Sequence, residues 1–238
     1  MDETKIPIQE HLRDLRKCLI RSLIALVVVS CCCYAFSPFF MEVLKRPILQ
    51  ALPIETKLVV LAPYEYFFLE LKSSLFFALL LCSPFLFSQI WLFIAPGLYH
   101  NEKKFLSYFV ILATLFFILG LIFAYYLVFP IIFQFFIETL PSDIVPTYSI
   151  NIVYGFCITI LLSFGLVFQT PLLVILLVLF ELINIQSIAA SRKYVFVASF
   201  IVGAILTPPD PLSQIMLAVP MYCLFELGLF FANFIIKK

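Results

Sequence analysis

Charged residues are scarce in this sequence, and long apolar runs take their place. Only 12% of the 238 residues are charged, against 64% that are hydrophobic. A soluble domain carries about 25% charged and about 45–50% apolar residues, and no water-soluble core could hide this much apolar surface. The sequence therefore predicts an all-α polytopic membrane protein, for which lipid is the main solvent. The formal net charge of +1 provides no overall field that would attract nucleic acid.

Catalytic and metal-binding motifs are also missing. The two histidines, His11 and His100, stand in no HExxH motif, and no GxSxG, GxGxxG or Walker P-loop occurs. The seven cysteines form no CxxC pair, so we interpret them as small apolar residues rather than as a disulfide framework. We expect no cofactor and no metal. An intramembrane enzyme is disfavoured, because the sequence offers no nucleophile with a matching base.

Six apolar runs give the expected architecture. Windows of about 20 apolar residues place the spans at residues 22–41, 71–94, 105–129, 152–177, 194–206 and 213–232 of a single membrane domain, 1–238. An amphipathic segment precedes the first span, which is expected to serve as its own insertion signal. The stretch 42–70 is interpreted as a surface cap of short helices and turns.

The last two spans are predicted to be short. Each offers about 13 apolar residues before Thr207 or Glu226 is reached, a rise of about 20 Å against a hydrocarbon core of about 30 Å. Such spans are accommodated by local thinning of the membrane or by oligomerisation. The alternative is that flanking apolar residues complete each span.

Basic residues are unequally divided between the two membrane sides. Six spans put both termini on one side, where eleven Lys and Arg residues fall, against four on the other side. Because basic residues favour the cytoplasmic side, both termini and the loop that contains Glu102 are predicted to be cytoplasmic.

Ionisable residues are absent from the interiors of the first five spans, and Glu226 lies near the cytoplasmic end of the sixth. Ion transport normally requires such residues inside the membrane. A secondary transporter of a small solute is the alternative function, but it would need a polar mid-membrane site, usually in repeated halves. Gln169, two residues before Pro171, is the candidate polar residue near the middle of a span. It either meets a partner in lipid or satisfies its own kinked helix.

Carboxylates at the cytoplasmic edge are the leading candidates for a binding site. A partly dehydrated carboxylate binds guanidinium strongly through two matched hydrogen bonds, so Asp14 and Glu102 would suit a ligand with paired arginines. The alternative is local pairing, of Asp14 with Lys17 and of Glu102 with Lys103 or Lys104.

The sequence resembles a known family, TatC, the polytopic core subunit of the twin-arginine protein translocase. The resemblance covers about residues 8–232 and rests on HLRDLRKCL, SPFLFSQIWLFIAPGLYHNEKK, GLIFAYYLVFP, FGLVFQTP, RKYVFVASFIVGAILTPPDPLSQ and AVPMYCLFE. It implies a protein of the bacterial inner membrane that binds twin-arginine signal peptides of folded cargo. It also implies self-association, TatA- and TatB-like single-span partners, and transport driven by the proton-motive force.

By position, the resemblance places the signal-peptide site at Asp14, Phe93, Glu102, Lys103 and Lys104. The family usually has Glu where Asp14 stands, so the arginine pair is expected to depend more on Glu102. The basic pair Lys103 and Lys104 is often arginine in the family.

The resemblance also implies contact with partner subunits at Gln169 and Glu226. Gln169 departs from the family, which commonly has Glu there; an amide keeps the hydrogen-bonding capacity but cannot titrate. Glu226 could instead snorkel to the cytoplasmic interface.

Structural roles are expected at turns and helix ends. Asp210 is read as an N-cap followed by proline at the first helical position, with a role in assembly as the alternative. The complete set of expected structural residues is Pro47, Pro96, Gly97, Pro208, Pro209 and Asp210.

Overall fold

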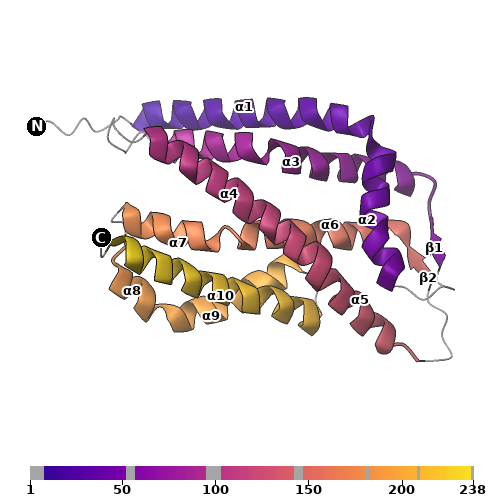
Figure 1. Ribbon diagram of the computed structural model, residues 1–238. Coiled ribbons are helices and arrows are strands. Elements are labelled where there is room, and N and C mark those ends of the chain that lie inside the picture. Colours follow the sequence, from indigo (N-terminus) through magenta and orange to yellow (C-terminus); the bar gives the residue numbers. More distant parts are fainter. Residues whose placement is uncertain are drawn as a thin grey trace, which may run out of the picture. The chain divides into compact units, whose positions relative to one another are not determined.

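The computed structural model describes residues 8–51, 57–94, 103–141, 147–180, 183–207 and 210–236. Almost all of this part of the chain is helical (Figure 1). In chain order the elements are α1 (Ile8–Tyr34), α2 (Ser37–Ala51), β1 (Lys57–Val59), α3 (Glu65–Ile94), α4 (Lys103–Phe123), the π-helical turn η2 (Ala124–Val128), α5 (Phe129–Glu138), β2 (Thr147–Ser149), α6 (Ile150–Val167), α7 (Thr170–Leu179), α8 (Ile185–Ala190), α9 (Arg192–Leu206) and α10 (Pro211–Ile236).

The prediction of a polytopic helical membrane protein is confirmed. Five stretches are long and apolar enough to cross a membrane by length and composition: Leu12–Tyr34, Glu65–Phe93, Ser107–Glu138, Ile150–Leu179 and Pro211–Phe234. The remaining expected crossing corresponds to α9, which has only 15 residues and is not among these five stretches. Its shortness agrees with the prediction for the fifth span.

The prediction of a short sixth helix was wrong, because α10 has 26 residues and continues through Glu226. The carboxylate of Glu226 is paired with the guanidinium of Arg192 at 2.8 Å. A paired and hydrogen-bonded carboxylate costs less to place among apolar residues than an unpaired one. Flanking apolar residues complete this span, which was the alternative reading.

Two helices break where the sequence carries proline. α1 ends at Tyr34 and α2 starts at Ser37, so a turn divides the stretch 22–41 that the sequence suggested as one span. The N–H of Phe36 donates to the carbonyl of Cys33 at 2.9 Å within this turn. The second break, between α6 and α7, lies at the expected place, just before Pro171.

The chain divides into two compact units. The first comprises Met1–Phe40 and Glu70–Leu115, and the second comprises Met41–Leu69 and Phe116–Lys238. In the first unit, the rings of Phe40 and Phe77 stack with centroids 4.1 Å apart. The buried Trp91 of α3 packs against Phe109 of α4 at 4.4 Å.

In the second unit, α2 is attached to later parts of the chain by two tyrosines. The hydroxyl of Tyr125, in η2, donates to the carbonyl of Val43 at 2.9 Å. The hydroxyl of Tyr154, in α6, donates to the carbonyl of Met41 at 3.5 Å. The strands β1 and β2 pair in parallel over three residues, with Leu58 opposite Tyr148.

Helices α7, α8, α9 and α10 lie side by side in this unit (Figure 1). Gly228 permits the close approach of α10 to α7, since a Cβ atom there would lie 2.9 Å from the Cα atom of Pro171. The core between these helices is apolar and consists of Val174, Val178, Ile188, Phe225, Leu229 and Ala232.

Candidate functional site

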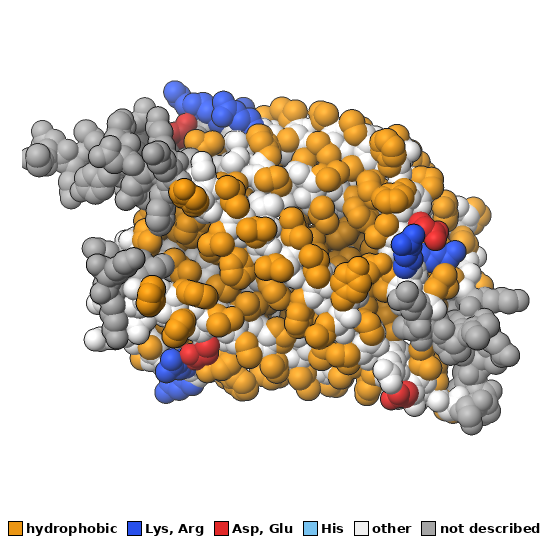
Figure 2. Space-filling view, viewed as in Figure 1, with side chains coloured by type: hydrophobic (Ala, Val, Ile, Leu, Met, Phe, Trp, Pro, Cys, Tyr) orange, Lys and Arg blue, Asp and Glu red, His pale blue; other side chains and the backbone are white. Residues whose placement is uncertain are grey.

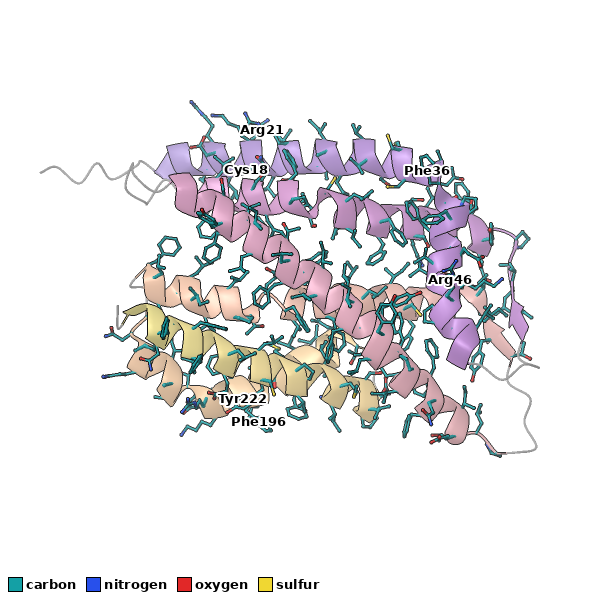
Figure 3. All side chains as sticks on the ribbon, in the orientation of Figure 1. Cys18, Arg21, Phe36, Arg46, Phe196 and Tyr222 are labelled. Atoms are coloured by element: carbon teal, nitrogen blue, oxygen red, sulfur yellow. The ribbon has the colours of Figure 1, made fainter. Side chains whose placement is uncertain are left out.

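Asp14 lies on α1 with its side chain about half exposed (48%). The ammonium of Lys17, one turn later, contacts its carboxylate at 3.2 Å, which is the local pairing that the sequence offered as an alternative. An exposed helix pair of this kind contributes about 0.3–0.5 kcal/mol. The carboxylate is therefore held only weakly and stays open to a stronger ligand. The exposed Arg21 projects from the same helix (Figure 3).

Phe93 lies in the last turn of α3, in the same compact unit as Asp14, and its side chain is partly buried. The helix α4, which starts at Lys103, has its first part in this unit as well. Side chains of Lys103 and Lys104 lie outside the described residues, as do the whole of Glu102, Pro96 and Gly97. One compact unit thus carries Asp14, Phe93 and the start of α4.

Gln169 lies in the turn between α6 and α7, and its side chain is partly exposed. The hydroxyl of Thr170 contributes to the kink at this turn. Pro171 has no N–H to donate to the carbonyl of Val167, and the hydroxyl of Thr170 donates to that carbonyl at 2.6 Å instead. The sequence analysis considered Gln169 and missed the hydrogen bond that Thr170 makes at the kink.

Asp210 stands at the start of α10, where its Oδ1 accepts a hydrogen bond from the N–H of Ser213 at 2.7 Å. This is the geometry of an N-cap. Its other carboxylate oxygen, Oδ2, is buried and has no hydrogen-bond partner among the described residues. Pro47 lies inside α2, next to the fully buried Ile48, whereas Pro208 and Pro209 fall outside the described residues.

A polar group that sequence reasoning missed joins α9 to α10. The Nε of Arg192 lies 2.8 Å from Oε1 of Glu226, and the Nη2 of Arg192 donates to Oε2 at 3.0 Å. The hydroxyl of Tyr222 also donates to Oε1, at 3.1 Å. The two partners of the ion pair are 34 residues apart, so no local pattern could reveal it.

The ring of Tyr222 packs edge-on against Phe196 of α9, with centroids 5.4 Å apart (Figure 3). A groove of about 800 Å³ opens beside this polar group. In Figure 2, basic and acidic side chains lie together at the place that α9 takes in Figure 1, and apolar side chains surround them. The groove is lined by Ile185, Gln186, Ala189, Arg192, Tyr222, Cys223, Glu226, Leu227, Leu229, Phe230 and Asn233.

No cluster of three or more His, Cys, Asp or Glu side chains that could hold a metal ion occurs in the part of the chain that the structure describes. The polar arrangements present can hold charged or hydrogen-bonding ligands.

Comparison with known proteins identifies the family of this chain. Residues 10–220 match the profile of TatC, described as Sec-independent protein translocase protein (TatC). A protein of this name from Magnetococcus marinus is 37% identical over 236 residues, covering 99% of this chain and 87% of the relative. Its namesake from Escherichia coli is 34% identical over 232 residues, covering 98% of this chain and 90% of the relative.

A solved structure has the same fold. The crystal structure of the twin arginine translocase receptor TatC superimposes with a TM-score of 0.85 at 33% sequence identity. The match covers 94% of this chain and 99% of the solved one.

Proposed function

Because this chain belongs to the TatC family of Sec-independent protein translocase proteins, we propose that it is the signal-peptide receptor and core of a twin-arginine translocase. It is a multi-pass protein of the bacterial inner membrane and a translocase subunit rather than an enzyme. The observation that carries the receptor role is the half-exposed carboxylate of Asp14, in one compact unit with Phe93. Both termini lie in the cytoplasm in this proposal, where signal peptides arrive.

The ligand is a signal peptide with two consecutive arginines, and Asp14 and Glu102 each receive one guanidinium. A bidentate arginine–carboxylate pair at a partly dehydrated site is stronger than a single ammonium contact. A hydrogen bond to a charged group contributes about 1.5–3 kcal/mol, against about 0.3–0.5 kcal/mol for an exposed pair such as Asp14 with Lys17. An arginine of the peptide can therefore displace Lys17.

Phe93, Lys103 and Lys104 complete the proposed site. The partly buried ring of Phe93 offers apolar contact to the part of the peptide that follows the arginines. Lys103 and Lys104 are basic and repel a cationic ligand, so Glu102, the one acidic residue in the sequence 95–104, is where a guanidinium would bind in this loop.

Partner subunits are proposed to contact Gln169 and Glu226. These partners are TatA- and TatB-like single-span proteins, and further copies of this chain complete the assembly. The side chain of Gln169 is partly exposed, so a neighbouring helix can reach it. An amide cannot titrate, so the contact works without a proton at this position, although the transport itself uses the proton-motive force.

The proposal is tested by binding of a fluorescent twin-arginine peptide to the purified full chain in lipid nanodiscs, with a twin-lysine peptide as the comparison. We expect the twin-arginine peptide to bind about tenfold more tightly, because lysine cannot form the bidentate pair. Glu102→Gln should remove most of this preference and Asp14→Asn should weaken it.

Glu138→Gln is the matched control, because Glu138 is an exposed carboxylate in the other compact unit and should not affect peptide binding. Equal binding of both peptides, unchanged in the Asp14 and Glu102 variants, would contradict the site.

A further inference from the structure

The groove beside Arg192 and Glu226 combines an ion pair with an apolar channel, and the partner contact proposed at Glu226 does not account for Arg192 or for the channel. Its apolar lining includes Leu227 and Phe230, whose side chains are 49% and 67% exposed. Both lie on α10 within the stretch that is apolar enough to span a membrane. Lipid is the surrounding solvent at this surface.

The guanidinium of Arg192 has hydrogen-bonding capacity left over. Two of its nitrogens face the carboxylate of Glu226, whereas arginine carries five N–H donors. Glu226 in turn also accepts from Tyr222. The polar end of the groove therefore offers donors more than acceptors, which suits an anionic oxygen group such as a phosphodiester.

A second cation lies at the same level of the helix. Lys193 follows Arg192 directly, and its ammonium lies 5.1 Å from the centre of the Tyr194 ring. No acidic partner for Lys193 occurs among the described residues. Arg192 and Glu226 cancel each other, so Lys193 leaves this end of α9 with a positive charge.

Because α9 is short, its first turn would lie at the level of a lipid headgroup. The 15 residues of α9 rise about 22 Å, which falls short of a hydrocarbon core of about 30 Å. Arg192 is the first residue of this helix. A short span is matched by a locally thinner bilayer, and a phospholipid whose phosphate reaches down to Arg192 provides that thinning.

We propose that this groove binds one membrane phospholipid, with its phosphodiester on the free N–H groups of Arg192 and one acyl chain along Leu227 and Phe230. The inference rests on the membrane location of the family and does not require the receptor role. A partner helix that contacts Glu226, as proposed above, would have to displace this lipid. The lipid is therefore expected to be bound only when no partner subunit contacts this surface.

The test is native mass spectrometry of the full chain released from nanodiscs, without signal peptide or partner subunits. The probes are phosphatidylglycerol, phosphatidylethanolamine and an uncharged diacylglycerol with the same acyl chains. We expect one phospholipid to be retained, and diacylglycerol to be retained about tenfold less, as expected for loss of a charge-assisted hydrogen bond. Equal retention of diacylglycerol would overturn recognition of the phosphate.

Two variants test the position of the lipid. Ala189→Trp fills the groove while keeping both residues of the ion pair, and should lower phospholipid retention about tenfold. The double variant Arg192→Gln, Glu226→Gln removes the phosphate donor without leaving an unpaired charge, and should lower retention as much. Arg21→Gln, on the exposed face of α1, is the control and should retain the lipid.

Unchanged retention in both groove variants, with the chain folded as judged by its helical circular dichroism, would overturn the proposal. Two other results would also overturn it. One is retention of inorganic phosphate alone in the groove, and the other is co-purification of a single-span protein in place of lipid.

Discussion

Arg192 and Glu226 form a fork-like ion pair between the first residue of α9 and the distal half of α10, with contacts of 2.8 and 3.0 Å. Pairs of this geometry are stronger than single-contact pairs because two hydrogen bonds act in one plane. The side chains are 54% and 34% exposed, so solvent screens part of this attraction.

We expect a double-mutant cycle with Arg192→Gln and Glu226→Gln to give a coupling free energy of about 1 kcal/mol, the upper end for exposed pairs. The measurement is the free energy of unfolding of the full chain in mixed micelles. The matching cycle with Asp14→Asn and Lys17→Gln should give about 0.3 kcal/mol. A coupling for Arg192 and Glu226 no larger than that of the α1 pair would contradict the structure.

Gly228→Ala should destabilise the chain by about 1–3 kcal/mol, the usual cost of overpacking. The added Cβ would lie 2.9 Å from the Cα of Pro171 and 3.0 Å from the Cβ of Val174, and backbone cannot move aside as a flexible side chain can. Gly155→Ala is the control, since no atom outside its own helical backbone and its chain neighbours lies within 4 Å of its Cβ position. Thermal denaturation in detergent measures both, and equal melting temperatures would be the contrary result.

Thr170→Val should cost about 1–3 kcal/mol, because it leaves the buried carbonyl of Val167 without a donor next to Pro171. Thr159→Val is the matched control. The hydroxyl of Thr159 donates to the carbonyl of Gly155, which also accepts a main-chain bond within α6, so its loss should change stability little. If the two variants unfold at the same denaturant concentration, the role assigned to Thr170 is wrong.

Asp210→Ala should destabilise α10 by about 1 kcal/mol through loss of the N-cap bond to Ser213. Asp210→Asn should keep most of the stability, because an amide oxygen can accept the same bond. Hydrogen exchange at the first turn of α10 reports the difference directly. Faster exchange in the Asn variant, equal to that in the Ala variant, would argue against capping.

The apolar runs were enough to predict the membrane fold, because lipid requires nearly every residue of a span to be apolar and leaves a clear pattern. The end of α10 was missed for a physical reason. From the neighbouring sequence alone, Glu226 is expected to lie in water and to end the membrane span. Its ion-pair partner, Arg192, is distant in the sequence.

Local rules succeeded where both partners are near in sequence. The geometry of Asp210 with Ser213 and the break before Pro171 each involve residues within one turn. The division of the stretch 22–41 into α1 and α2 escaped prediction, because residues on both sides of the turn are apolar and proline is tolerated within membrane helices, so Pro38 does not by itself mark a break.

The signal-peptide site stays a prediction at Glu102, Lys103 and Lys104. Asp14 was selected from its charge and from the resemblance, and its partial exposure and weak pairing are compatible with ligand binding. Charge alone does not separate such a carboxylate from other exposed acids, which is why Glu138 serves as the comparison.

The two tyrosine hydroxyls that hold α2 have a consequence for the order of events during synthesis. The carbonyl of Val43 can be bonded only after Tyr125, 82 residues later, has been synthesised. The carbonyl of Met41 can be bonded only after Tyr154, 113 residues later. At a synthesis rate of about 5–20 residues per second, these anchors emerge on the order of ten seconds after α2. During that interval α2 has neither bond, so its final seating follows the insertion of η2 and α6 and is a late step in biogenesis.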